Sequence, residues 1–359
     1  MNKWTYLKYY TILTGPIFAY MALTWHGLWT YLLPFYVFIL IPTLELIFRG
    51  TTENMTAAEE AIAKEDPIYD WLLYLLVPTQ YVILFYFFFS ITEVGLSTFE
   101  LVGRIWSMGI VCTTLGINVG HELGHRAKKY EQFLSKALLL STLYMHFFIE
   151  HNRGHHKRVA TEEDPATARY GDNVYGFWLR SVIFGYLSAW KIEAERLKKR
   201  NIAVFSLHNQ MLRFQIIQIA FIASIYFFFG SFVTLCFIAA AIIGFSYLEV
   251  VNYIEHYGLK RKKIGENRYE KVLPVHAWNS NHPLGRIMLF EVTRHSDHHF
   301  RASRKYQLLR HFDKTPYLPF GYPTMILIAL CPPLWFYIMH KEIEKFRANY
   351  PKEALDLAA

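Results

Sequence analysis

The sequence predicts an all-α integral membrane protein with six transmembrane helices and a histidine-rich cytosolic region. Hydrophobic residues make up 53% of the 359 residues and charged residues only 18%, against about 25% charged residues in typical soluble domains. Apolar runs recur at about 20 residues, the length that a helix needs to cross a bilayer. Fourteen of the 16 histidines lie between His121 and His311. This composition excludes a disordered chain or a fibre, and it is too apolar for a typical soluble enzyme.

The apolar runs divide the chain into two membrane segments and two polar segments. We expect transmembrane helices at about residues 8–25, 28–48, 71–92, 101–120, 213–230 and 232–254. A seventh run, Tyr322 to Met339, is interrupted by Pro332 and Pro333, so we expect a re-entrant or interfacial segment there. The organisation is therefore four helices in 1–120, a polar segment in 121–212, two helices in 213–254 and a second polar segment in 255–359.

The basic residues predict the orientation of these segments. Residues 119–213 hold 15 of the 37 Lys and Arg residues, and residues 254–359 hold another 17. The loops between the paired helices, near His26, Glu93 and Gly230, hold none. Because cytoplasmic loops carry an excess of Lys and Arg, we expect both polar segments and both termini in the cytosol. The net charge of +8 then reflects flanks of membrane helices, and no nucleic-acid binding is expected.

Cysteine usage excludes several kinds of site. The chain has three cysteines, Cys112, Cys236 and Cys331, and all lie in apolar stretches without a CxxC pair. A disulfide framework or a cysteine-based zinc site is therefore not available.

Three histidine motifs predict a metal centre. They are His121-Glu-Leu-Gly-His125, His151-Asn-Arg-Gly-His155-His156 and His295-Ser-Asp-His298-His299. Residues four apart lie on one face of a helix, and neutral imidazole is the commonest metal ligand. We expect the pairs His121/His125, His151/His155 and His295/His299 each to hold an ion, with His156 and His298 reaching a second ion. Eight imidazoles exceed the needs of one ion, so two ions are the simplest interpretation.

A zinc hydrolase is the main alternative from the motifs alone. The first motif matches HExxH, the zinc-protease helix in which the glutamate is the general base. Such a site needs only three protein ligands, which would leave most histidines of the motifs without a role. Imidazole suits iron, copper, zinc and nickel, so ligand type alone does not decide the metal.

Four longer strings carry a family resemblance. They are Asn118–His125 (NVGHELGH), Glu150–His156 (EHNRGHH), Asn252–Leu259 (NYIEHYGL) and Arg294–His299 (RHSDHH). Together they resemble the bacterial membrane-bound alkane 1-monooxygenases, which belong to the membrane di-iron hydroxylase and desaturase superfamily. The resemblance implies two iron ions and no catalytic residue beyond their ligands. It implies nine ligands: His121, His125, His151, His155, His156, His256, His295, His298 and His299.

The resemblance also implies a reaction and its partners. The expected function is hydroxylation of the terminal methyl group of medium- to long-chain n-alkanes with O2, at the cytosolic face of the bacterial inner membrane. Electrons would come from rubredoxin, an acidic iron–sulfur protein reduced by an NAD(P)H-dependent rubredoxin reductase. Rubredoxin would be a separate chain, because three cysteines without a CxxC cannot form its iron site. Candidate docking residues beside the motifs are Arg126, Lys128, Lys129, Lys157, Arg158, Arg301, Arg304 and Lys305.

An alkane offers no polar group for recognition, so selectivity must come from the shape of an apolar tunnel. We expect that tunnel among residues 35–48, 81–89 and 105–115. Two alternatives within the superfamily stay open. One is an aryl-methyl hydroxylase acting on toluene- or xylene-like substrates. The other is a fatty acyl desaturase, although its middle motif is more often HxxHH than the HxxxHH present here.

The remaining charged and histidine residues receive weaker predictions. Carboxylates expected to orient ligand imidazoles are Glu122, Glu150, Asp164, Glu249, Glu255 and Asp297. His276 and His282 are expected beside the ligands, and His146 is a weaker candidate for contact with the site. We expect surface or interface positions for His26, His208, His311 and His340.

Overall fold

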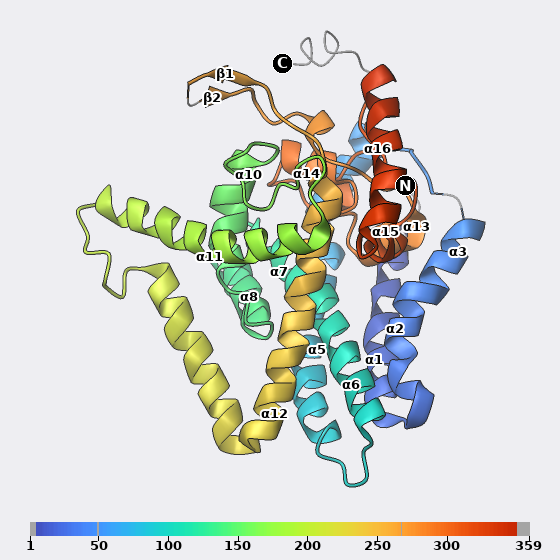
Figure 1. The fold of residues 1–359 in the computed structure, drawn as a ribbon, viewed down its shortest axis with the longest axis vertical. Helices are drawn as coiled ribbons and strands as arrows, with labels where there is room; N and C mark the ends of the chain where they lie inside the picture. The colour runs from blue at the N-terminus through green and yellow to red at the C-terminus, as the bar shows by residue number, and fades with distance from the viewer. Residues whose placement is uncertain (1–4, 49, 267, 350–359) are drawn as a thin grey trace.

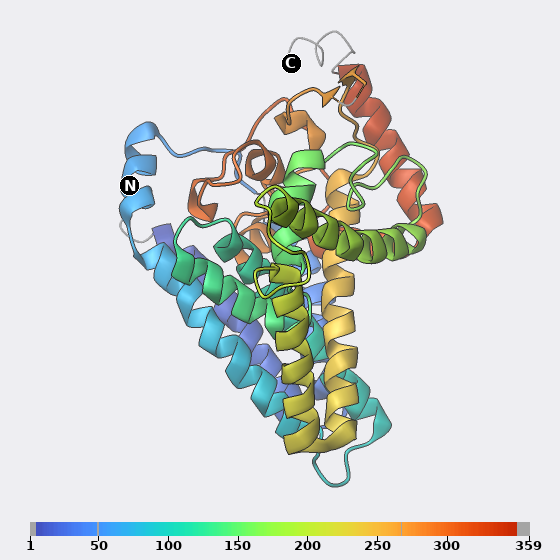
Figure 2. The same cartoon turned by 90° about the vertical axis from the view of Figure 1, so that its left-hand side faces the viewer.

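The computed structural model describes residues 5–48, 50–266 and 268–349. Four of its helical segments are long and apolar enough to cross a membrane: Gly27–Ile47, Ile68–Ser90, Thr98–Gly124 and Gln210–His256. They run side by side at one end of the molecule, and the shorter elements gather at the other end (Figures 1 and 2). The protein is therefore an integral membrane protein that is mostly helical, with almost no sheet in its described residues.

The membrane half contains several helices that change type along their length. The segment Gly27–Ile47 joins η2 (Gly27–Tyr31), α2 (Leu32–Phe35), η3 (Tyr36–Leu40) and α3 (Ile41–Ile47). The segment Thr98–Gly124 joins α6 (Thr98–Val111), the π-helix η4 (Cys112–Asn118) and α7 (Val119–Gly124). Ser97 and Glu100 form a capping box that starts α6. The other long helices are α5 (Ile68–Ser90) and α12 (Gln210–His256).

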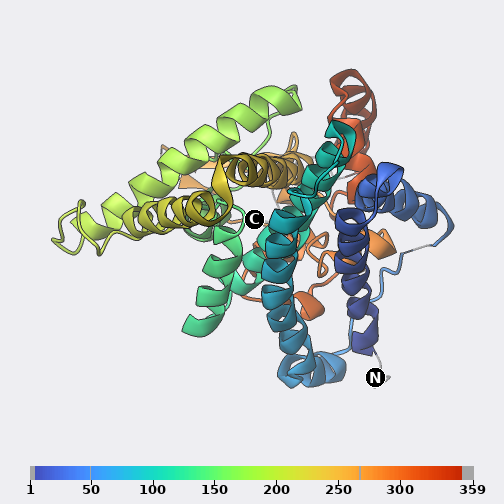
Figure 3. The ribbon, with the colours of Figure 1, turned by 90° about the horizontal axis from the view of Figure 1, so that it is seen from below.

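Helix α12 holds both of the last two predicted spans. Gly230 has φ 81° and ψ 176°, and the helix reverses there into two arms that form a V in Figure 1. Only glycine adopts this backbone conformation without strain. Seen along the bundle, the first arm and α11 (Val174–Lys198) extend together to one side (Figure 3).

The first predicted span differs from the expectation. Residues 8–25 lie in η1 (Thr5–Leu13), α1 (Thr14–Thr24) and the following residue, and they are not among the four candidate spans. Lys8 forms an ion pair with Glu291 at 3.1 Å, and the Tyr9 hydroxyl donates to the same carboxylate at 2.8 Å. The start of this run is therefore held against the polar C-terminal segment.

The polar half contains short helices and one small hairpin. Its elements are α4 (Ala57–Glu65), α8 (Lys129–Leu140), α9 (Phe147–Ile149), η5 (Glu150–His155), α10 (His156–Arg158), β1 (Lys263–Gly265), β2 (Arg268–Tyr269), η6 (Pro274–His276), α13 (Pro283–Met288), α14 (His295–Phe300) and η7 (Tyr306–Leu308). The seventh apolar run forms α15 (Tyr322–Ala329) and α16 (Pro332–Asn349), which the prolines separate. Strands β1 and β2 pair antiparallel.

Close helix packing brings distant motifs together. A Cβ at Gly109 would lie 2.4 Å from Ile243, and a Cβ at Gly244 would lie 2.6 Å from the Cβ of Cys112. Small residues of this kind let membrane helices approach closely. Because α6 and η4 pack on the second arm of α12, α7 and the end of α12 meet at the same level. These two ends carry the first histidine motif and His256.

Candidate metal centre

The nine histidines form two buried sets. The five-histidine set comprises His121, His125, His151, His156 and His298. The four-histidine set comprises His155, His256, His295 and His299. Within each set the nitrogen atoms offered lie within 4.8 Å of one another. The residues lie in α7 and directly after it, in η5 and α10, at the end of α12, and in α14. The fold therefore gathers them from four separate parts of the sequence.

The five Nε2 atoms of the first set form a closed ring. In order around the ring, His121, His298, His156, His151 and His125 are separated by 3.0, 3.1, 3.0, 3.1 and 3.1 Å. An uncharged imidazole nitrogen carries either one hydrogen or one lone pair. It therefore cannot serve two neighbours at once, and hydrogen bonds do not account for this ring. Two nitrogens at right angles around an ion ~2.1 Å away would lie about 3.0 Å apart, so the ring fits a metal ion.

The four-histidine set is similar and has a carboxylate beside it. His299 Nε2 lies 2.9 Å from His295 Nε2, which lies 3.2 Å from His256 Nε2. Glu255 Oε2 is 3.2 Å from the same nitrogen of His295. Glu255 is thus the carboxylate placed to join this set, while its other oxygen accepts the Tyr322 hydroxyl at 2.8 Å.

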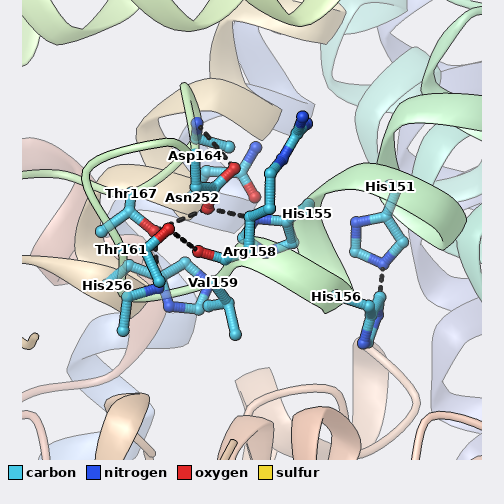
Figure 4. Close-up of polar contacts among 12 residues, drawn as sticks. His151, His155, His156, Arg158, Val159, Thr161, Asp164, Thr167, Asn252 and His256 are labelled. Carbon is cyan, nitrogen blue, oxygen red and sulfur yellow. Dashed lines mark hydrogen bonds and ion pairs between the residues drawn. The ribbon is translucent and has the colours of Figure 1, made fainter. Parts of the chain in front are cut away.

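His155 is oriented by a buried carboxylate. Its Nδ1–H donates to Asp164 Oδ2 at 2.8 Å (Figure 4). Its Nε2 is buried and has no hydrogen-bond partner among the described residues. Thr167 also donates to Asp164, at 2.6 Å. Burial opposes ionisation of Asp164, but its interaction with His155 and the hydrogen bonds outweigh burial and lower the pKa of Asp164.

Burial favours the neutral form of six ligand histidines. Desolvation, together with repulsion from neighbouring imidazoles, lowers the pKa well below the ordinary histidine value at His125, His151, His156, His295, His298 and His299. Neutral imidazole is the form that binds metal. The lowered pKa values and the spacing of the nitrogen atoms therefore both favour metal binding by these residues.

One predicted pairing of the motifs is wrong. His151 and His155 do not share a set, although they are four residues apart. The reason is that η5 is a π-helix, with hydrogen bonds from i to i+5. His151 therefore meets His156, and their Nε2 atoms lie 3.0 Å apart (Figure 4). The pairs His121/His125 and His295/His299 each fall within one set, as expected.

An apolar cavity leads from the membrane helices to the histidines. Its outer part lies among η3, α6, η4, α12 and α15, and its wall includes Val37, Ile110 and Ile326. Its inner part is lined by His121, His151 and His295. The two parts share Thr113, Val251, Leu289 and Tyr322. We call the two parts together the substrate cavity.

Comparison with known proteins decides the family. A family model described as fatty acid desaturase matches residues 97–329. The chain is 38% identical to an alkane 1-monooxygenase of Acinetobacter baylyi, over 91% of this chain and 81% of that protein. It is 37% identical to alkane 1-monooxygenase 2 of Pseudomonas aeruginosa, over 91% of this chain and 88% of that protein. The chain belongs to the alkane 1-monooxygenase family. The hydroxylase component of xylene/toluene monooxygenase from Pseudomonas putida is more distant, at 28% identity over 67% of this chain and 64% of that protein.

Membership of the alkane 1-monooxygenase family, together with the histidine sets, indicates iron as the bound metal. Of the predicted orienting carboxylates, Asp164 and Glu255 contact ligand histidines. Glu150 instead binds Arg158, and Asp297 accepts the backbone N–H of Arg310. Glu122 binds Arg126, and Glu249 accepts from Tyr144.

The other histidines lie outside both sets. His146 is buried between the rings of Tyr144 and Tyr186. His276 pairs with Glu270, and His282 with Ser280. His26 meets Glu93 and Glu100, His311 pairs with Asp313, and His340 accepts from Tyr257, while His208 lies in the turn before α12.

The substrate cavity contains residues that sequence analysis missed. Val251 and Leu289 line both of its parts, but no predicted tunnel segment or motif includes them. Of the three predicted tunnel segments, 35–48 and 105–115 contribute to the wall, and no described residue of 81–89 does.

Half of the basic residues near the motifs are neutralised. Arg126 pairs with Glu122 and Asp70, and Arg158 pairs with Glu150. Arg304 and Lys305 are likewise paired, with Glu60 and Asp70. Of the eight candidate docking residues, the four that form no ion pair with a described residue are Lys128, Lys129, Lys157 and Arg301, and all four are exposed. Lys128 and Lys129 follow His125, and Lys157 follows His156, which are the two half-buried members of the five-histidine set.

Proposed function

We propose that this protein hydroxylates the terminal methyl group of medium- to long-chain n-alkanes. The observation that carries the proposal is the substrate cavity, which is apolar along the membrane helices and ends at His121, His151 and His295. The names of the related proteins favour the same reaction. It is R–CH3 + O2 + 2 e⁻ + 2 H⁺ → R–CH2OH + H2O.

The proposed cofactor is a pair of iron ions. One ion would be held by the five-histidine set, and the other by the four-histidine set with Glu255 beside it. When bound, the irons supply the reduction of O2 and the oxidation of the C–H bond. The separation of nine imidazoles into two sets supports two ions, because a single ion takes four to six ligands.

The protein residues would position the alkane and exclude water. An alkane binds through burial of its apolar surface, worth roughly 25 cal/mol per Å². It makes no directional contact, and the passage between the two parts of the cavity, at Thr113, Val251 and Leu289, would admit the chain end-on. Tyr322 lies at the same passage, and its hydroxyl holds Glu255 in place. The terminal methyl group would then be the first carbon to reach the histidines.

We further propose six spans, with the metal centre on the cytosolic side of the bacterial inner membrane. The reversal of α12 at Gly230 supports two spans in 213–254, and residues 1–120 would supply the other four. The polar segments 121–212 and 255–359 carry most of the basic residues, as cytoplasmic segments do. Membrane lipid would surround the helical half.

The proposed electron donor is rubredoxin, a separate chain reduced by an NAD(P)H-dependent rubredoxin reductase. The cysteines support an external donor, since Cys112 and Cys236 are buried in separate helices and Cys331 lies at the start of α16. An acidic donor would dock beside His125 and His156 on the unpaired cations Lys128, Lys129, Lys157 and Arg301. Complementary charge would raise the rate of encounter.

The two other candidate functions have less support. An aryl-methyl hydroxylase is supported by the 28% relative, against 37–38% for the alkane enzymes. A fatty acyl desaturase is supported by the family model alone. A long apolar cavity also suits an alkane better than a compact aromatic ring.

Substrate profiling tests the proposed function. Purified protein loaded with iron is supplied with rubredoxin, its reductase and NADH, and offered n-alkanes from octane to hexadecane, p-xylene and stearoyl thioester. Gas chromatography of the products should show 1-alkanols as the main products. Faster oxidation of p-xylene than of every alkane, or a double bond in the acyl chain as the main product, would contradict the proposal.

A further inference from the structure

A second cavity, which we call the inner chamber, also reaches the metal centre. Its wall includes His151 of the five-histidine set and His155 of the four-histidine set. Its polar groups come from α11, α12 and the segment around η5: Tyr144, His146, Glu150, Ser181, Glu249 and Asn252. It has room for about one water molecule. Among the described residues it shares only Phe147, His151 and Asn252 with the inner part of the substrate cavity.

Glu249 is a buried carboxyl group on a membrane helix, facing the inner chamber. Tyr144 donates its hydroxyl to Oε1 at 2.8 Å, and Asn252 donates its amide to Oε2 at 3.2 Å. Ser181 donates its hydroxyl to the same Oε2. No Lys or Arg in the described part of the chain forms an ion pair with Glu249. Ionisable groups at such positions in membrane proteins commonly mark ion or proton pathways.

The contacts of Glu249 suit a group that gains and loses a proton. A serine or tyrosine hydroxyl can either donate or accept a hydrogen bond. An ionised Glu249 accepts from Tyr144, Ser181 and Asn252, and a protonated Glu249 donates to one of the two hydroxyls instead. The carboxyl group therefore changes its protonation without a change in packing.

Glu150 connects the inner chamber with the outside. Its Oε1 accepts from Arg158 at 2.7 Å, and its Oε2 accepts from Ser188 at 2.9 Å. Arg158 and Ser188 both line a solvent-facing hollow of about 860 Å³ beside α11. Gly154 makes room for this arrangement, since a Cβ there would lie 2.1 Å from Glu150 Oε2. The hollow and the inner chamber are adjacent, because Pro165 lines both of them and Glu150 of the chamber contacts Arg158 and Ser188 of the hollow.

We propose that the inner chamber is the route by which protons reach the metal centre, with Glu249 as the proton-holding group inside it. The inference rests on the proposed function, whose reaction consumes two protons with the two electrons of the reduced donor and yields one alcohol and one water. Each proton leaves the O–H of Glu249, and the carboxylate then regains one from the solvent-facing hollow. The outer part of the substrate cavity is lined almost entirely by apolar groups and opens no polar path from outside, so a separate polar route keeps alkane and water apart.

Replacing Glu249 with glutamine tests this route. Glu249→Gln keeps the size of the side chain but cannot carry the proton, and Glu249→Asp keeps the acid. Iron content and thermal stability are measured first. The alcohol formed and the peroxide released per NADH consumed are then measured in H2O and in D2O. We expect near-parental iron content, at least about a tenfold loss of alcohol per NADH, more peroxide and an altered solvent isotope effect. Glu249→Asp should recover part of the alcohol yield.

A matched control separates this role from a structural one. Glu45 is also a buried carboxyl on a membrane segment, where it accepts the backbone N–H of Gly285 at 2.8 Å. Glu45→Gln should leave alcohol per NADH and the isotope effect unchanged, whatever its effect on stability. Parental coupling and isotope effect in Glu249→Gln would overturn the proposal, because a purely structural Glu249 changes stability alone.

A second measurement does not depend on turnover. An infrared difference spectrum between the parent protein and Glu249→Gln, both free of iron, isolates the band of the protonated Glu249 carboxyl group. We expect this band to shift within seconds after transfer to D2O. A band that stays unshifted for hours would overturn the route even if alkanes are hydroxylated. If the parent oxidises no alkane while the band exchanges, the proposed function fails, and solvent access to Glu249 still stands.

Discussion

The Nδ1–H of His155 donates to Asp164 at 2.8 Å, and this contact points the opposite nitrogen of His155 toward the four-histidine set. Both side chains are almost fully buried, so no water competes for the contact. A carboxylate in this position fixes the tautomer of the imidazole and raises its basicity as a ligand. The loop that carries Asp164 therefore belongs functionally to the metal centre.

Asp164→Asn should weaken iron binding rather than the fold of the membrane half. Loss of such a partner typically lowers metal affinity or activity by about 10–100-fold. Iron per chain and alkane hydroxylation are the measurements. Asp313→Asn is a matched control, because Asp313 pairs with His311 at 3.1 Å on the surface, away from both histidine sets. Equal iron loss in both variants would argue against a specific role for Asp164.

Single ligand substitutions should distinguish the two histidine sets. His298→Ala removes a member of the five-histidine set, and His299→Ala removes a member of the four-histidine set. Each should reduce bound iron from about two ions toward about one per chain and abolish hydroxylation, because both ions are needed. Elemental analysis and Mössbauer spectroscopy measure the change. His208→Ala, outside both sets, should keep iron and activity; an inactive, well-folded His208→Ala would show that the ligand set is misassigned.

The metal-free protein should lose stability in acid. Burial lowers the pKa of six ligand histidines outside the membrane segments. Between their folded-state pKa values and the ordinary value of about 6.5, the unfolded chain binds more protons, so stability falls as pH falls. Thermal melting of iron-stripped protein between pH 7.5 and 5.5 should show a steep decrease. A melting temperature that stays constant or rises over this range would contradict the neutral, buried state.

The length of the substrate cavity should set the length of the alkane. Gly15 lines the outer part, and a Cβ there would meet no atom within 4 Å. Gly15→Leu should therefore fill space without strain and lower the rate with hexadecane relative to octane by about tenfold. Gly176→Leu on the exposed side of α11 is the control, since its Cβ makes only ordinary contacts. An unchanged ratio in Gly15→Leu would place the alkyl chain elsewhere.

Spacing and hydropathy predicted the helical membrane class, and the motifs identified every histidine of the two sets except His256. His256 came from resemblance alone, because one histidine at the end of an apolar run has no periodic signal. The separation of His151 from His155 was not predictable, because it depends on the π-helical hydrogen bonding of η5. The grouping of the inner-chamber residues around one cavity was missed for a related reason. Tyr144, Ser181 and Glu249 are far apart in sequence, and only tertiary packing brings them together.

The sequence predicted more basic residues for docking than the structure leaves unpaired. Arg126, Arg158, Arg304 and Lys305 are basic residues beside motifs, but the structure pairs each with a carboxylate. Those partners come from α4, α5, α7 and η5, and sequence alone does not show which cation meets which anion. Four exposed cations remain for an acidic partner.

Turnover with rubredoxin should fall as ionic strength rises. All four unpaired candidate cations follow a motif histidine within four residues: Lys128 and Lys129 after His125, Lys157 after His156, and Arg301 after His299. Salt screens attraction between exposed charges, with a Debye length of about 10 Å at 0.1 M, so encounter slows as salt increases. Lys128→Glu with Lys157→Glu should raise the KM for rubredoxin about tenfold and leave the KM for octane unchanged.

Lys198→Glu, at the exposed end of α11, is the matched control. Normal rubredoxin dependence of the double variant at low salt would place the docking surface elsewhere, and activity with NADH in the absence of any partner protein would contradict an external donor.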